Sequence, residues 1–198
     1  MPIVLASASP RRQELLKNAG IEFVVKPANI PEERQKNEAP QAFAERMARE
    51  KARAVWAWIK NDEYVLGADT VVIVGATGVS PVRPELILGK PLDEQDAARM
   101  LRLLSGRKHH VTTGVCLIGP NFEDVRSETT AVHFSALSDD DIRDYIATGE
   151  PMDKAGAYAI QGAASRWISK IEGDYSNVVG LPVTLVLQML REHRAIGS

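Results

Sequence analysis

The chain has 198 residues, enough for one α/β domain with a sizeable core but not for two large independent domains. Hydrophobic residues make up 44% and charged residues 25% of the sequence, which excludes a disordered or fibrous protein. The 24 basic and 26 acidic side chains give a net charge of -2, unlike the positive charge of most nucleic-acid-binding proteins. We therefore expect a single domain over residues 1–198, with a lobe on each side of a cleft, that binds no nucleic acid.

Three features indicate where the protein works. Cys116 is the only cysteine, so an intrachain disulfide is excluded and a reducing compartment fits. The apolar run near the N-terminus is only a few residues long and is followed by arginines, whereas basic residues come first in a secretory signal. No apolar stretch approaches the roughly 18 to 20 residues needed to cross a bilayer. We expect a cytoplasmic protein that is not inserted in a membrane.

The chain opens with a predicted strand, a polar loop and a helix. Residues 3–6 are apolar, and Ser9 and Pro10 have the form of a helix N-cap followed by proline in the first turn. The loop and the start of this helix contain Ser7, Ser9, Arg11 and Arg12. Helix-start amides, two hydroxyls and two guanidinium groups could form a phosphate-binding site, but a capped helix with solvated arginines fits the same spacing. The glycines and lysine of a Walker loop are missing.

The next helix carries one charged residue in an unexpected place. On a helical wheel of residues 40–60 the apolar side chains occupy one face, and Lys51 lies in the middle of it. An unpaired ammonium there would cost several kcal/mol. Lys51 must either extend to the edge of the helix or meet an anion, such as a substrate phosphate or Asp69. The preceding residues 26–40 are polar and proline-rich and predict a loop, where Glu32 is most simply a solvated acid.

Asp69 is the other candidate, because it lies inside a predicted strand. Residues 64–74 are rich in β-branched side chains, so the carboxylate is expected in dry surroundings with a pKa that depends on its neighbours. It could be a structural carboxylate paired with a lysine or a backbone amide. It could also position water or hold a divalent cation such as Mg²⁺.

The remaining segments complete a mixed α/β pattern. Residues 75–91 contain three glycines and three prolines and predict an extended, hairpin-like segment ending at Lys90. Further strands are expected at residues 111–118, 125–134, 157–161 and 167–171, and further helices at residues 93–106, 138–149 and 182–190. The four histidines show no metal-ligand spacing.

Several segments together resemble a known family. They are LASASPRRQELL (5–16), REKARA (49–54), GADTVV (67–72), GKP (89–91), LSG (104–106), GEPMDKAGAYAIQG (149–162) and VVGLP (178–182). They are similar to the Maf-like nucleoside triphosphate pyrophosphatases, and most closely to the dTTP/UTP pyrophosphatase branch. The resemblance implies a mixed α/β fold with a strongly curved central sheet flanked by helices, two lobes around a cleft, and a homodimer.

The resemblance also implies an activity and its residues. Members of the branch hydrolyse the α-β phosphate bond of dTTP and UTP to a nucleoside monophosphate and pyrophosphate, with a divalent cation (Mg²⁺ or Mn²⁺). Asp69 matches the proton acceptor that activates water, and Glu32 and Asp69 match the cation site; whether Asp69 is base, metal ligand or both stays open. The family positions that contact the triphosphate are matched here by Ser7, Arg11, Arg12, Lys51 and Lys90. The family positions that select the base are matched here by Arg11, Thr70 and Gln161.

Alternatives and departures accompany this assignment. The 7-methyl-GTP branch typically has Trp, Gln and Glu where this chain has Arg11, Thr70 and Gln161, and a glutamine amide suits the imide edge of thymine or uracil. A house-cleaning enzyme for modified pyrimidine nucleotides fits the same residues, as does a nucleotide-binding regulator of septum formation without turnover. Residues 75–88 are longer than the family usually has, and Pro31 stands where relatives commonly carry a second acid.

Overall fold

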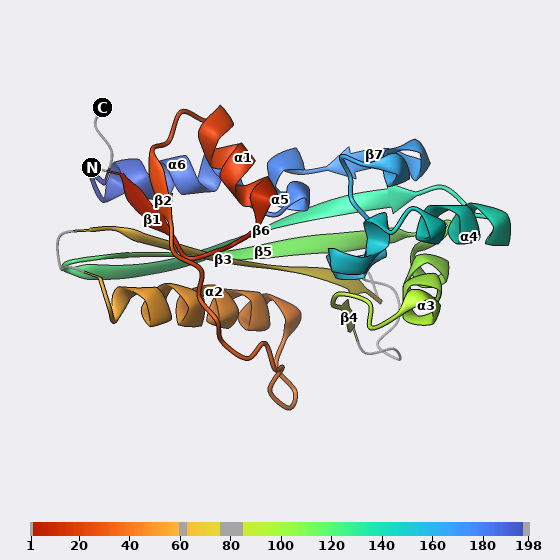
Figure 1. Ribbon diagram of the computed structural model, residues 1–198, viewed down its shortest axis with the longest axis horizontal. Helices are drawn as coiled ribbons and strands as arrows, with labels where there is room; N and C mark the ends of the chain where they lie inside the picture. Colours follow the sequence, from red (N-terminus) through yellow and green to blue (C-terminus); the bar gives the residue numbers. More distant parts are fainter. Residues whose placement is uncertain (1, 60–62, 76–84, 196–198) are drawn as a thin grey trace. The chain divides into compact units, whose positions relative to one another are not determined.

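The computed structural model describes residues 2–59, 63–75 and 85–195 and divides into two compact units. The first unit comprises residues 1–70, 113–128 and 176–198, and the second comprises residues 71–112 and 129–175. Figure 1 shows the helices and strands of both units. The single domain expected from the sequence stays a prediction.

The strands form one mixed sheet, as expected. They are β1 (Ile3–Leu5), β2 (Phe23–Val25), β3 (Val65–Val74), β4 (Leu86–Leu88), β5 (Lys108–Gly119), β6 (Phe122–Phe134) and β7 (Ile168–Glu172). Their order is β2-β1-β3-β5-β6-β7, with β4 paired to β3. Strand β1 is parallel to β2 and β3, whereas β4 and β7 are antiparallel to their neighbours.

The helices flank this sheet. They are α1 (Pro10–Asn18), α2 (Pro40–Trp56), α3 (Glu94–Leu104), α4 (Asp139–Ala147), α5 (Tyr175–Val179) and α6 (Val183–Glu192). Three short 3-10 helices are η1 (Glu150–Asp153), η2 (Ala155–Ala157) and η3 (Ala163–Trp167). The predicted cap of α1 is confirmed, because the Ser9 side chain accepts a backbone N–H at its start. The Asp93 and Ser138 side chains do the same at the starts of α3 and α4. No described helix is both long and apolar enough to cross a membrane.

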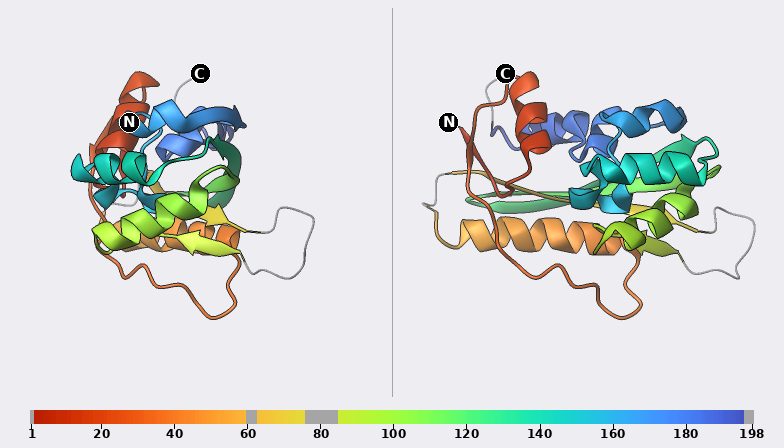
Figure 2. Two further views of the ribbon diagram at one scale, coloured as in Figure 1. Left: turned by 90° about the vertical axis from the view of Figure 1, so that its right-hand side faces the viewer. Right: turned by 45° about the vertical axis from the view of Figure 1, so that its right-hand side comes forward.

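In the first unit, successive side chains of each strand point to opposite faces of the sheet. On β3, Leu66 packs in a cluster with residues of α1 and α6, whereas Val65 packs in a second cluster with residues of α2. Helix α2 therefore covers one face of this part of the sheet, and α1 and α6 cover the other (Figures 1 and 2). The same alternation places Asp69 on the α2 face and Thr70 on the face of α1 and α6.

Helix α2 approaches the sheet closely at two glycines. A Cβ atom on Gly67 of β3 would lie 2.3 Å from the carbonyl oxygen of Ala48, and one on Gly114 of β5 would lie 2.4 Å from that of Ala44. Both oxygens belong to the backbone of α2, so they cannot rotate out of the way. This close approach brings Lys51 of α2 opposite Asp69, which lies two positions after Gly67 on β3.

Gly67→Ala is expected to lower the free energy of unfolding by about 3 kcal/mol, because the added methyl group would push α2 away from β3. Urea denaturation measures this loss. Gly89→Ala is the matched control, since a Cβ atom there would meet no described heavy atom within 4 Å. Equal losses for the two variants would contradict the steric explanation.

One predicted strand is wrong. The segment 157–161 begins at Ala157, which has a φ of 59° and follows Gly156 with a φ of 71°, and this left-handed pair turns the chain out of the extended conformation. The short apolar run of this segment favoured a strand, but such a run cannot reveal a backbone reversal. The sequence also gave no sign of the short helix α5. In the predicted hairpin-like segment, β4 pairs antiparallel with β3, and residues 76–84 lie outside the described residues.

Candidate functional site

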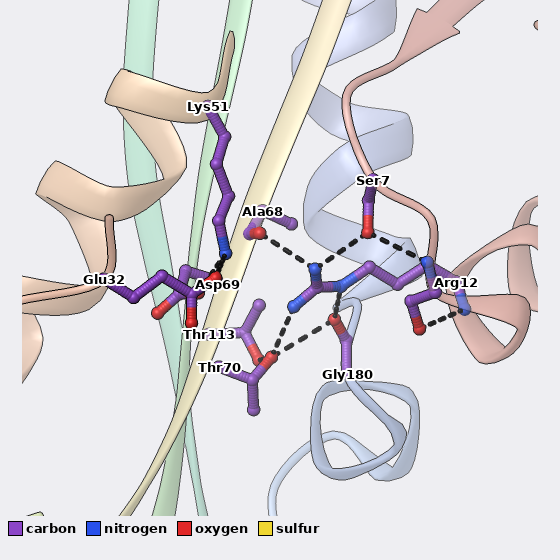
Figure 3. A network of polar contacts seen from close by, with 10 residues as sticks. Ser7, Arg12, Glu32, Lys51, Ala68, Asp69, Thr70, Thr113 and Gly180 are labelled. Atoms are coloured by element: carbon purple, nitrogen blue, oxygen red, sulfur yellow. Dashed lines mark hydrogen bonds and ion pairs between the residues drawn. The ribbon is translucent and has the colours of Figure 1, made fainter. Parts of the chain in front are cut away.

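Lys51 is buried on α2 with 8% of its surface exposed, and it meets two carboxylates. Its Nζ atom lies 2.6 Å from Oδ1 of Asp69 and 2.6 Å from Oε1 of Glu32. Figure 3 shows the ammonium group between the two acids. Of the two possibilities for Lys51, the structure confirms the one in which it meets an anion.

Asp69 lies in dry surroundings, as its place in an apolar strand predicts. It is 7% exposed, and burial raises the pKa of its carboxyl group, because the charged form loses hydration. The neighbouring ammonium of Lys51 and, more weakly, the guanidinium of Arg12 oppose this shift by stabilising the charged form. Burial therefore raises the pKa of Asp69, and the positive charges of Arg12 on α1 and Lys51 on α2 lower it.

Glu32 differs from Asp69 in its exposure. Its side chain is 51% exposed and comes from the loop before α2, so the expectation of a surface acid is right about its exposure but missed its ion pair with Lys51. Because Glu32 and Asp69 contact the same nitrogen atom, their oxygens are close to each other. Carboxylate oxygens are the ligands that Mg²⁺ prefers, and this ion is commonly held by one or two carboxylates together with water and phosphate oxygens.

These two acids could therefore contribute to a divalent-cation site. Among the described residues no cluster of three or more Asp, Glu, His or Cys side chains suits a metal ion. Further ligands would accordingly have to come from water or from the substrate. Such a donor set fits Mg²⁺ or Mn²⁺ better than a structural zinc site, which has four protein ligands.

Arg12 of α1 contacts the other face of β3. It is 9% exposed, and its Nη1 atom donates to the Ala68 carbonyl oxygen at 2.9 Å and to Ser7 Oγ at 3.1 Å. Its Nη2 atom donates to Thr70 Oγ1 at 3.0 Å, and Nε donates to the Gly180 carbonyl oxygen at 2.8 Å (Figure 3). Arg12 thus holds the residues on both sides of Asp69 and joins them to the loop before α6.

This role of Arg12 was not foreseen, although the sequence contained a signal for it. Residues four apart lie on the same side of a helix, and Leu16, four residues after Arg12, is fully buried in the core. Burial lowers the pKa of the Arg12 guanidinium, and Asp69 partly offsets that effect. Arg11, one residue earlier, is only half-buried. Phosphate contacts of both arginines stay a prediction.

The Thr70 hydroxyl lies at the centre of a second set of contacts. Its Oγ1 atom is 2.9 Å from Thr113 Oγ1 of β5 and 3.3 Å from the Gly180 carbonyl oxygen, and Thr113 donates to the Asn177 carbonyl oxygen at 3.2 Å. Gly180 has a φ of 129°, a conformation that favours glycine, and its carbonyl oxygen accepts from Arg12. Sequence reasoning assigned no role to Thr113, Asn177 or Gly180.

Lys90 and Gln161 belong to the second unit. Both side chains are exposed, Lys90 two residues after the end of β4 and Gln161 in the turn between η2 and η3. The N–H of Gly156 donates to the Gly89 carbonyl oxygen at 3.0 Å, so the segments that carry these two residues are joined. Ser7, Arg12, Glu32, Lys51, Asp69 and Thr70 are brought together within the first unit.

The chain is similar over nearly its whole length to known proteins of one family. The sequence profile of the family described as Maf-like protein matches residues 2–193. A relative from Koribacter versatilis named dTTP/UTP pyrophosphatase is 56% identical over 191 residues, which cover 96% of this chain and 94% of the relative. A relative of the same name from Geobacillus sp. is 45% identical over 195 residues, covering 98% of each chain. A third from Geobacter sp. is 49% identical over 201 residues, covering 99% of this chain and 97% of the relative.

Proposed function

The chain belongs to the Maf family, and we propose that it hydrolyses the α-β phosphate bond of nucleoside triphosphates to a nucleoside monophosphate and pyrophosphate. The observation that carries the proposal is the buried Asp69 carboxylate with Lys51 and Glu32 beside it. The preference we propose is for dTTP and UTP. It is supported by the names of relatives that are 45% to 56% identical over nearly the whole chain.

We assign the proton acceptor to Asp69. Its Oδ1 atom is bound by Lys51, so Oδ2 is the oxygen that would take the proton from the water attacking the α-phosphorus. A carboxyl group whose pKa is raised by burial is a stronger base than a solvated one. Lys51 fixes the orientation of the carboxylate, and its positive charge reduces the repulsion between the two acids and the triphosphate.

Glu32 and Asp69 would hold a divalent cation, Mg²⁺ or Mn²⁺. When bound, this ion neutralises charge on the phosphate oxygens and on the leaving pyrophosphate. Further triphosphate contacts are assigned to Ser7, Arg11, Arg12, Lys51 and Lys90. Ser7 Oγ accepts from Ser9 N at 3.3 Å and from Arg12, so its own hydrogen is the group that it would offer to a phosphate oxygen.

Base selection is assigned to Gln161 together with Arg11 and Thr70. Gln161→Glu is expected to lower kcat/KM for dTTP and UTP by about 10- to 100-fold, because a carboxylate cannot donate to the carbonyl groups of the pyrimidine imide. The measurement compares dTTP, UTP, dCTP and GTP. Gln95→Glu on the exposed surface of α3 is the control. Equal losses with all four nucleotides would contradict base reading.

The function itself is tested by a nucleotide panel with Mg²⁺ or Mn²⁺ and separation of pyrophosphate from orthophosphate. Cleavage of dTTP and UTP to monophosphate and pyrophosphate is the expected result. Binding without cleavage would favour the nucleotide-binding regulator instead. Faster turnover of 7-methyl-GTP, or of a modified pyrimidine nucleotide, would change the assigned substrate but keep the reaction. A homodimer in the cytoplasm stays a prediction, and sedimentation tests its assembly.

A further inference from the structure

The turn that carries Gln161 is attached to two side chains of the second unit. Tyr145, near the end of α4, donates its hydroxyl hydrogen to Oε1 of Glu150 at 2.7 Å and accepts from the N–H of Ala159 at 3.2 Å. The other carboxylate oxygen of Glu150, Oε2, accepts from the N–H of Ala163 at 3.2 Å. The chain is therefore fastened two residues before and two residues after Gln161.

The turn also lies directly against the Glu150 carboxylate. A Cβ atom on Gly162 would be 2.0 Å from Oε1 and 2.4 Å from Cδ of Glu150, so glycine is the residue that permits this contact. The N–H of Gly162 donates to the Ala159 carbonyl oxygen at 3.1 Å, which closes the turn around Gln161. The Gln161 side chain itself is exposed. Its backbone is thus fixed while its amide group stays available.

The Tyr145 ring and the Glu150 backbone make further contacts that hold these two residues in place. Tyr145 is fully buried, and its ring contacts Trp167 edge to face, with 5.3 Å between the ring centroids. The N–H of Glu150 donates to Thr148 Oγ1 at 3.2 Å, and its carbonyl oxygen accepts from Lys154 Nζ at 3.2 Å. Burial raises the pKa of the Tyr145 hydroxyl, which therefore remains a hydrogen-bond donor at neutral pH.

We propose that Tyr145 and Glu150 are positioning residues that determine nucleotide selectivity by holding the Gln161 turn in one conformation. The inference rests on the proposed base-reading role of Gln161. An amide that must donate to and accept from one base edge discriminates only if its backbone is fixed, because a mobile turn lets the amide adapt to other bases. Neither Tyr145 nor Glu150 needs to touch the nucleotide for this effect.

Two substitutions test the proposal. Tyr145→Phe removes the hydroxyl but keeps the ring against Trp167. Glu150→Gln keeps the size of the side chain but replaces one acceptor oxygen with an NH2 group, so when the remaining oxygen accepts from the N–H of Ala163, the Tyr145 hydroxyl no longer has an acceptor for its hydrogen. Each variant is expected to lower the ratio of kcat/KM for dTTP to kcat/KM for dCTP by about 5- to 10-fold, mainly through a higher KM for dTTP. Amide hydrogen exchange of residues 158–163 should become faster.

The ratio separates positioning from general damage, because a smaller fraction of folded enzyme lowers both kcat/KM values equally. Tyr64→Phe, the same deletion in the first unit where the ring packs beside Phe122, should leave the ratio unchanged. Equal losses for dTTP and dCTP in Tyr145→Phe and Glu150→Gln would overturn the proposal.

Gln161→Ala distinguishes failure of this inference from failure of the base-reading proposal. If Gln161→Ala changes the ratio but Tyr145→Phe and Glu150→Gln do not, the positioning role is wrong and base reading survives. If Gln161→Ala leaves the ratio unchanged, both are wrong. In the expected case, adding Tyr145→Phe to Gln161→Ala causes no further loss of selectivity, because the two changes act through one group.

Discussion

Asp69→Asn is expected to lower kcat for release of pyrophosphate from dTTP by about 1000-fold, measured at saturating nucleotide and divalent cation. Asparagine has the shape of aspartate, but it cannot take a proton from water at neutral pH. The fold should persist, because Lys51 keeps Glu32 as a partner at 2.6 Å. Steady-state kinetics and urea denaturation of the same preparation measure the two effects separately.

Asp124→Asn is the matched control for this prediction. Asp124 is a half-buried carboxylate of the first unit, and it contacts Arg126 and His193. Its substitution should leave kcat within about 2-fold of the unsubstituted protein, in line with the small effects usual away from a reactive centre. If Asp69→Asn kept a tenth or more of the activity, Asp69 would not be the proton acceptor.

Arg12→Met is expected to lower the free energy of unfolding by about 3 to 5 kcal/mol. Without the guanidinium, the buried carbonyl oxygens of Ala68 and Gly180 lose a donor, and Thr70 loses one of its hydrogen bonds. Arg12→Lys should also be destabilising, since one ammonium nitrogen cannot reproduce the planar, forked geometry of the guanidinium. Urea denaturation followed by circular dichroism measures both losses.

Arg11→Met is the control for stability, because Arg11 lies in the same helical turn but is only half-buried. Its loss should be below about 1 kcal/mol. If Arg12→Met lost activity without losing stability, phosphate binding would be the main role of Arg12. In that case Arg12→Met would unfold at the same urea concentration as the unsubstituted protein and would lose only activity.

The sequence predicted the features of the site that depend on local periodicity. Helical spacing placed Lys51 on an apolar face, and strand composition placed Asp69 in dry surroundings; their ion pair follows once α2 covers β3. Capping chemistry likewise located the start of α1 at Ser9. These inferences succeeded because each rests on residues within one helix or strand.

The contacts that the sequence did not predict join distant segments or depend on special backbone conformations. No local pattern indicates that Arg12 meets the Gly180 carbonyl group, or that Thr70 meets Thr113 across the sheet. The left-handed conformation of Ala157 is equally hidden, because a positive φ is uncommon for residues other than glycine. The turn at Gln161 was therefore read as a strand, and the supports at Tyr145 and Glu150 were missed.

The hydrogen bond from Arg12 to Gly180 has a consequence for the order in which the protein is made. These residues are 168 positions apart, so at about 5 to 20 residues per second a ribosome adds Gly180 roughly 8 to 30 s after Arg12. Lys51 and Asp69 are synthesised within that interval, before the Gly180 carbonyl group that completes the contacts of Arg12. The nascent chain thus contains Asp69 long before Arg12, which holds its strand β3, can make its hydrogen bond to Gly180.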